Sequence, residues 1–208
     1  FPRLPLYAYV PAVGLGGPRA AFLQRARFLG ISEFGPGSLI YHEGRAYRVW
    51  KAKLSSESRS TDAVTLRTRT LYLCPSCGGA HEDAKPELCH VCGASLAGVA
   101  GIPRILRIDN VETRPTERIT ANDEERQRRG FEIQTLFAWP DHDHATEVIS
   151  GIAEDDQGGV LRLDYAPGTL ISRVNKGLRR RKEKSMRGFG IDPATGRWTG
   201  DPEANDGD

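Results

Sequence analysis

The sequence has little methionine, little lysine and no long apolar run. Met186 is the single methionine and the chain starts with Phe1, so we expect a piece of a longer protein or a processed product. No apolar run approaches the roughly 20 residues that a membrane-spanning helix requires, which argues against an integral membrane protein. The apolar start of the chain contains three prolines and lacks the basic start and compact apolar run of a signal peptide.

Motifs for nucleotide binding and catalysis are also missing. No G-x-x-x-x-G-K-[ST] occurs, so the loop that cradles ATP phosphates is absent from the sequence. The acids and histidines of 141–144 fit an exposed polar loop better than a metal site, and the acids of 123–125 suit the first turn of a helix. No nucleophile, base and orienting group form a recognisable set. The pattern therefore favours a chain without catalysis of its own and gives little support to a stand-alone metalloenzyme.

Lysine is scarce, and arginine supplies most of the positive charge. Of the 29 basic residues, 23 are Arg, whose fixed fork of donors fits phosphate. The segment 173–187 carries eight basic side chains and one Glu, a net charge of +7 on a chain whose total is +2. A dense basic run on a near-neutral protein indicates a polyanionic partner. The alternative is a solvated basic loop.

Cysteine occurs only as two C-x2-C pairs, separated by eleven residues, and a glycine follows each pair. Two residues between the thiols allow both sulfurs of a tight turn to face one ion, and four thiolates give the closed tetrahedron of structural zinc. Two disulfides are an alternative, but nothing in the sequence suggests secretion. A redox site would need one pair only. We predict one structural Zn²⁺ held by Cys74, Cys77, Cys89 and Cys92.

Two histidines, His81 and His90, lie between and beside these cysteines. Because four thiolates already complete the tetrahedron, we expect both imidazoles to be exposed. A closed site also lacks an open position for water, so the predicted metal is structural rather than catalytic.

The pattern along the chain predicts mostly strands. We expect an extended Pro/Gly-rich arm over 1–20 and a short amphipathic helix over 19–31. A strand pair with its turn at Glu43–Gly44 is predicted over 38–54. Further elements are a helix over 120–130, strands over 63–73, 101–114, 131–139, 146–153 and 159–166, and a final hairpin around 192–196.

One short internal similarity links the two halves. FGPGSLI (34–40) and YAPGTLI (165–171) both predict a Pro-Gly turn that leads into a strand. After the second copy we expect a turn at 175–177 and a return strand. A helix is the alternative, because Leu170, Val174 and Leu178 are spaced four residues apart.

These elements predict a mainly β fold of the β-rich α+β class, a curved sheet or small barrel with an inserted four-cysteine zinc ribbon. The expected divisions are the arm and short helix over 1–33, a first β-rich half over 34–73, the ribbon over 74–98, a second β-rich half with the basic segment over 99–200, and an acidic tail over 201–208.

The order of several longer motifs resembles one known family. They are RARFLGISEFGPGSLIYHEGRAYRV, CPSCG with CHVCG, ETRPTERITANDEERQRRGFEIQT and NKGLRRRKEKSMRGFGIDPATGRW. Over roughly residues 1 to 200 the chain is similar to the C-terminal zinc-binding domain of bacterial superfamily 2 DEAD/DEAH-box DNA helicases of the mitomycin repair factor A type. Related zinc domains occur in anti-phage defence systems, including the DISARM system.

The resemblance implies that the four cysteines bind zinc. It also implies that the parent protein is cytoplasmic and nucleoid-associated. That parent would carry two RecA-like motor domains upstream, which bind ATP and move 3′ to 5′ on DNA. In a first hypothesis this chain holds single-stranded or junction DNA during repair. Phosphate contacts are then predicted for Arg179, Arg180, Arg181, Lys182, Lys184 and Arg187, and base stacking for Tyr47, Trp50 or Trp198. For each single aromatic residue, core or hairpin packing is the favoured alternative.

A second hypothesis is a structural or docking role without DNA contact. The β domain would brace the motor domains or bind a partner protein in a defence complex, and the basic run would meet an acidic protein surface. The arm over 1–20 would be a tether or docking strand through Leu6, Tyr7, Tyr9 and Val10.

Overall fold

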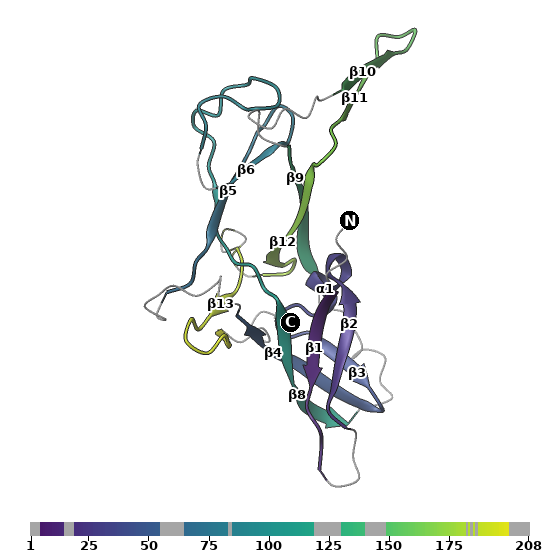
Figure 1. The fold of residues 1–208 in the computed structure, drawn as a ribbon, viewed down its shortest axis with the longest axis vertical. Coiled ribbons are helices and arrows are strands. Elements are labelled where there is room, and N and C mark those ends of the chain that lie inside the picture. The colour runs from purple at the N-terminus through teal and green to yellow at the C-terminus, as the bar shows by residue number, and fades with distance from the viewer. Residues whose placement is uncertain are drawn as a thin grey trace. The chain divides into compact units, whose positions relative to one another are not determined.

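The computed structural model confirms the mainly β class. Among the described residues it forms fourteen strands and one α-helix (Figure 1). No helix in these residues combines the length and the apolar character required to cross a bilayer. The structure describes residues 5–14, 19–54, 65–82, 85–118, 130–139, 149–181, 183, 185 and 187–199.

The chain divides into two compact units. Unit 1 combines 1–68, 106–134 and 173–208, and unit 2 combines 69–105 and 135–172. The predicted ribbon over 74–98 falls inside unit 2, and the predicted β-rich halves contribute to both units.

Unit 1 contains a five-stranded sheet in the order β2-β1-β8-β4-β3, in which β1 runs parallel to β8 and the other neighbours are antiparallel. Strands β3 and β4 turn across β1 and β8, so the sheet curls into a half-barrel (Figure 1). The strands are β1 Pro5–Val10, β2 Ala21–Ala26, β3 Leu39–His42, β4 Arg45–Lys53 and β8 Asn110–Arg118.

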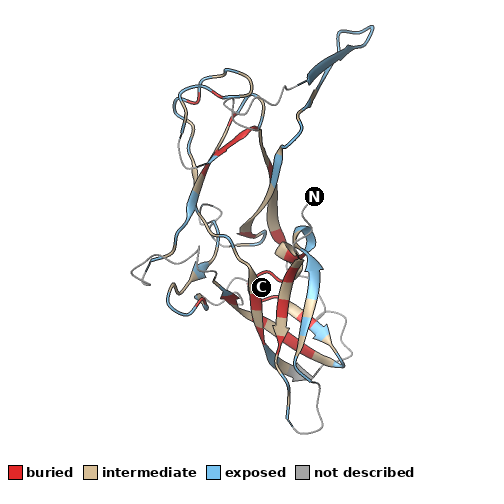
Figure 2. Ribbon diagram, in the orientation of Figure 1, coloured by how far each residue is buried: buried red, intermediate tan, exposed pale blue. Residues whose placement is uncertain are grey.

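The first strand lies inside this sheet, so the prediction of an N-terminal arm is wrong for Pro5–Val10. Its side chains alternate between half-buried and buried, as a strand with one face in the core requires. Leu6 and Val10, which the docking hypothesis had placed on a tether, are buried. Figure 2 shows the buried positions of this sheet in red. The core of the curled face consists of Leu6, Ala8, Phe34, Ile40, Val49 and Val111.

The helix predicted over 19–31 is only partly correct. Its first part is strand β2, which pairs with β1 along its full length, and helix α1 covers Arg27–Glu33. The residue spacing favours a helix here, but the backbone N–H and C=O groups of β2 form hydrogen bonds with β1 instead. Gly30 of α1 lies against Leu6, where a Cβ would approach to 3.1 Å.

The hairpin between β3 and β4 confirms the predicted turn. His42 pairs with Arg45, so the loop has two residues, Glu43 and Gly44. Their φ values are +46° and +73°. Two left-handed residues in succession are what a type I′ turn requires, and this turn suits the twist of the strands it joins.

Three further strand pairs lie downstream. Strand β9 (Phe131–Ala138) pairs with β12 (Leu170–Leu178), and β13 (Gly190–Ile191) pairs with β14 (Trp198–Thr199) in the hairpin expected around 192–196. Strand β10 (Ile149–Glu154) pairs with β11 (Val160–Tyr165).

The predicted return strand after a turn at 175–177 is wrong, as is the alternative helix. Strand β12 passes straight through these positions while it pairs with β9. The internal similarity holds locally, because Gly37 and Gly168 have φ values of +72° and +79° in turns that lead into β3 and β12. The helix predicted over 120–130 lies outside the described residues.

In unit 2, the strands next to the cysteines form a three-stranded sheet in the order β6-β5-β7. The strand predicted over 101–114 is two strands, β7 in this unit and β8 in the other. The one predicted over 63–73 begins at Arg69 among the described residues. The bounds are β5 Arg69–Leu73, β6 Ala80–Glu82 and β7 Ile102–Ile105.

Candidate metal centre and basic segment

The two cysteine pairs form two similar turns. In the first turn the Gly78 N–H donates to the Cys74 carbonyl at 2.9 Å, and in the second the Gly93 N–H donates to the Cys89 carbonyl at 2.9 Å. Both glycines are left-handed, with φ values of +76° and +70°. Glycine adopts this conformation without steric cost, which explains its place after each pair.

The four sulfur atoms lie together. Sγ of Cys74 is 3.6 Å from Sγ of Cys92, Sγ of Cys77 is 3.6 Å from Sγ of Cys89, and all four atoms lie within 4.8 Å of one another. A disulfide would bring two sulfurs to about 2.05 Å. A tetrahedral ion with metal–sulfur bonds of about 2.3 Å would place them about 3.8 Å apart. The four thiols therefore fit one metal ion.

The site has a small core of its own. Cys74, Cys89 and Leu96 are buried there, and Val91 and Val99 pack against them. The Leu96 N–H donates to the Glu87 carbonyl at 2.9 Å. A core with one large aliphatic side chain buries little apolar surface, and an ion bound by the four thiols would add a cross-link to it.

The expectation that both histidines are exposed is half right. His90 is exposed, but His81 on β6 is only 7% exposed. Their rings meet edge to face with centroids 4.9 Å apart. His81 is thus a packing residue beside the cluster, and the cysteines alone make up the candidate ligand set.

The surroundings affect the thiols differently. Burial raises the pKa of Cys74, but hydrogen bonds from the backbone N–H groups of Cys77 and Ser76 outweigh burial and lower that pKa to about 6. Burial raises the pKa of Cys77 and of Cys89. A divalent cation would keep all four as thiolates and release their protons, so metal binding should weaken as the pH falls.

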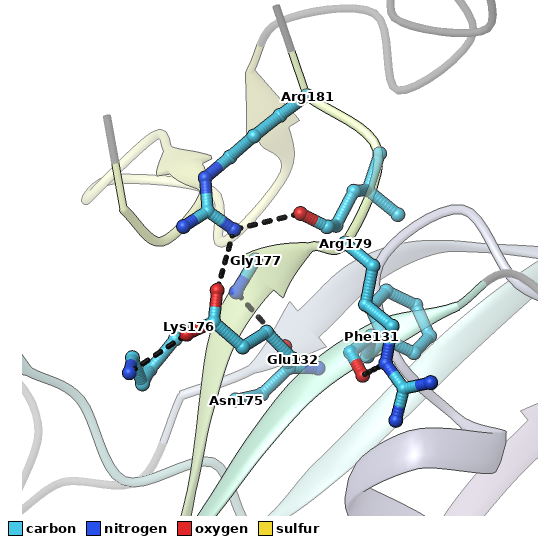
Figure 3. Close-up of polar contacts among 8 residues, drawn as sticks. Phe131, Glu132, Asn175, Lys176, Gly177, Arg179 and Arg181 are labelled. Atoms are coloured by element: carbon cyan, nitrogen blue, oxygen red, sulfur yellow. Dashed lines mark hydrogen bonds and ion pairs between the residues drawn. The ribbon is translucent and has the colours of Figure 1, made fainter. Parts of the chain in front are cut away.

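The basic segment, residues 173–187, is anchored at one acidic residue. Glu132 of β9 accepts from Nζ of Lys176 at 2.7 Å and from Nη1 of Arg181 at 2.8 Å (Figure 3). Nη1 of Arg181 also donates to the Leu178 carbonyl at 2.7 Å. Arg181 and Lys176 therefore hold the segment to its neighbouring strand, and Arg181 does not fit the predicted role of a free phosphate contact.

Arg179 is anchored by a different route. Its backbone N–H donates to the Gly130 carbonyl at 2.7 Å, and its Nε donates to the Phe131 carbonyl at 3.0 Å (Figure 3). The residue is nevertheless exposed, and its two Nη groups make no hydrogen bond or ion pair with any described residue. The backbone and Nε of Arg179 are therefore held in place, and its Nη groups can still donate to a phosphate.

Arg180 and Arg187 point to solvent. Both are exposed, and neither makes a hydrogen bond or ion pair with any described residue. The predicted contacts Lys182 and Lys184 lie outside the described residues. The continuous basic run thus contains two kinds of side chain, structural anchors and free cations.

Of the three predicted stacking residues, one is buried and two are half-buried. Tyr47 is 0% exposed in the core of unit 1, so the prediction that it stacks on a base is wrong. Trp50 is half-buried with the guanidinium Cζ of Arg197 4.9 Å from its ring centroid. Trp198 is half-buried against Phe189, with ring centroids 6.0 Å apart.

Glu132 gives a pH-dependent prediction. Its hydrogen bonds from Lys176 and Arg181 lower its pKa from 4.5 to about 2. Because the folded-state pKa is depressed, its contribution to stability is present above about pH 4.5 and is lost as the pH falls toward 2. Carboxyl carbon shifts measured by NMR on the folded chain should show Glu132 titrating last among the glutamates. A midpoint near 4.5 would contradict the anchoring.

Comparison of the chain with family models, with curated proteins and with solved structures finds no match. The fold and the site therefore define a class only, a mainly β protein with a curled sheet and a four-cysteine cluster that fits one metal ion.

Proposed function

We propose that this chain is a zinc-binding accessory domain that contacts DNA, and that it belongs to a superfamily 2 DNA helicase active in DNA repair. Zinc is proposed because four thiolates in a closed tetrahedral arrangement are the ligand set of structural zinc sites. The ordered motifs quoted above support the helicase assignment. Neither the ATPase nor strand separation is assigned to this chain, because its sequence carries no ATP-binding loop.

The observation that supports DNA contact is that the basic segment contains both side chains paired with Glu132 and exposed arginines without such a partner. Lys176 and Arg181 are held by Glu132, which fixes the segment at the end of β12. Arg180 and Arg187 remain exposed without a partner among the described residues. Free guanidinium groups on a fixed backbone can bind phosphates without first breaking ion pairs, so binding costs the order of their side chains but no existing contact.

Replacing both free arginines should weaken DNA binding in a salt-dependent way. For R180A/R187A we expect affinity for a single-stranded oligonucleotide to fall about tenfold at low salt. The magnitude of the slope of log K against log salt should fall by about 1.4, the value for two lost phosphate contacts on a single strand. Fluorescence anisotropy at several salt concentrations measures both quantities.

The matched control is R19A/R114A, which removes two exposed arginines from elsewhere in unit 1. An equal loss in both double variants would mean that only the general positive field matters. Unchanged affinity in R180A/R187A would defeat the proposed role of the basic segment.

A second candidate function is a protein-docking module that braces the motor domains or a partner in a defence complex. It is favoured by the strand pair β10–β11, in which every residue except the half-buried Asp164 is exposed (Figure 2). Ile149, Leu161 and Leu163 there are each more than half exposed. A gel-shift assay on the chain separates the two functions. Tight, salt-sensitive binding supports DNA contact, and no binding together with a stable complex with the motor fragment supports docking.

A further inference from the structure

An exposed aromatic ring lies at the start of the basic segment. Phe28 of α1 is 58% exposed. The guanidinium Cζ of Arg173 lies 4.0 Å from its ring centroid, and Nη1 of Arg173 donates to the Phe28 carbonyl at 2.6 Å. The arginine therefore covers part of the ring and fixes its position, while more than half of the residue faces solvent.

Strand β12 runs along α1 from this point. One turn of helix after Phe28, the Ile31 carbonyl accepts from Nδ2 of Asn175 at 3.3 Å. The Gly177 N–H then donates to Oδ1 of Asn175 at 3.1 Å, and Arg179 is held on β9 as described above (Figure 3). These contacts fix the whole stretch from Arg173 to Arg179 within unit 1.

The spacing suits a single strand of nucleic acid. An extended chain advances about 3.3 Å per residue, so β12 spans about 17 Å from Arg173 to Leu178, and Arg179 and Arg180 follow in a bend. Stacked nucleotides are about 3.4 Å apart along one strand, so this length corresponds to about five nucleotides. A base at Phe28 and phosphates at Arg180 can thus belong to one short oligonucleotide.

No other arginine-contacted ring in the described part of the chain is as open. Phe34, over which Arg25 lies, is buried, and Trp50 with Arg197 is half-buried. Exposed Phe22 contacts Tyr9, at 5.2 Å between ring centroids, rather than a cation. Only Phe28 combines exposure, a fixed cationic neighbour and continuity with the basic segment.

We propose that Phe28, with Arg173 behind it, is the base-stacking site of a single-stranded nucleic-acid surface that continues to Arg180. This inference rests on the proposed DNA contact and adds a residue that contacts a base rather than a phosphate. Stacking on an aromatic ring accepts every base, because each base has a π face. The site is therefore tolerant of sequence and selects unpaired bases, since paired bases in a duplex are already stacked.

The test compares two ligands on the full chain, a thymidine oligonucleotide and an abasic oligonucleotide of equal length and charge. F28A should bind the thymidine strand about tenfold more weakly, within the range of about 5- to 150-fold that one stacked base supplies, and the abasic strand as wild type does. F28W should retain binding to both. L29A, which changes the neighbouring exposed apolar residue, is the matched control and should bind as wild type.

The outcomes separate the two proposals. If wild type binds thymidine and F28A binds it equally well, the stacking site is wrong while DNA contact stands. If F28A loses both ligands equally, the residue only positions Arg173, which also overturns the inference. If wild type binds neither ligand, the proposed DNA contact fails and the stacking site fails with it. Thermal unfolding of F28A and F28W checks that each variant is folded.

Discussion

Removal of the metal is expected to unfold the four-cysteine module. The module has one large buried aliphatic side chain, Leu96, and strand β6 has only three residues, so little else holds its two turns together. Structural zinc in small modules contributes about 10–16 kcal/mol of apparent binding energy at neutral pH, which is comparable with the whole stability of a domain. Treatment with a strong chelator should therefore abolish the NMR dispersion of residues 74–98.

Replacing one ligand should have the same effect as the chelator. C89S is expected to reduce the bound zinc, measured by elemental analysis, from one ion per chain to none, and to lower the unfolding temperature. S76A, which changes the first turn but no ligand, is the control and should retain the ion. If the unfolding curve of C89S matched that of wild type, the metal would not stabilise the fold.

The variant G196A should be the most destabilising glycine substitution in unit 1. Gly196 has a φ of +77°, and an added Cβ would clash with the carbonyl oxygen of Ala52. The Ala52 N–H donates to the Gly196 carbonyl at 2.8 Å, so the two backbones cannot separate without losing that bond. We expect a loss of about 3 kcal/mol in the free energy of unfolding, measured with denaturant.

G44A is the matched comparison, because Gly44 has a similar φ of +73° but no atom within 4 Å of an added Cβ. Its expected loss is about 1 kcal/mol, the cost of a left-handed alanine alone. The difference between the two variants measures the close approach of Gly196 to β4. Equal losses would show that this approach is not maintained in solution.

The sequence predicted local structure well where the pattern and the fold agree. Alternation and turn residues located the β3–β4 hairpin and β9, and the cysteine spacing gave the complete candidate ligand set. The arm was predicted because its prolines and glycines suggest a linker. The spacing of residues along the sequence does not identify the strand with which a segment pairs. Strand β1 pairs with β8, which is about a hundred residues away.

The candidate nucleic-acid surface was predicted only in part. The density of arginine identified the segment 173–187, but not which side chains are anchors, because that depends on Glu132 of a strand distant in sequence. Phe28 was missed because it is 145 positions from Arg173. Of the large aromatics predicted instead, Tyr47 is buried and Trp50 and Trp198 are half-buried, because large apolar side chains are mostly at least partly buried.

The pairing of β1 with β8 also determines when the sheet can be completed. The Tyr7 N–H donates to Oδ1 of Asn110 across 103 positions, whereas β1 with β2 and β3 with β4 pair locally. Because closing long loops is entropically costly, hairpins form first and distant pairings limit the folding rate. During synthesis on the ribosome, the edge of β1 that pairs with β8 therefore stays unpaired until β8 has been synthesised. During that interval Leu6 and Ala8 lack Val111 of β8, one of the residues with which they form the core of the folded chain.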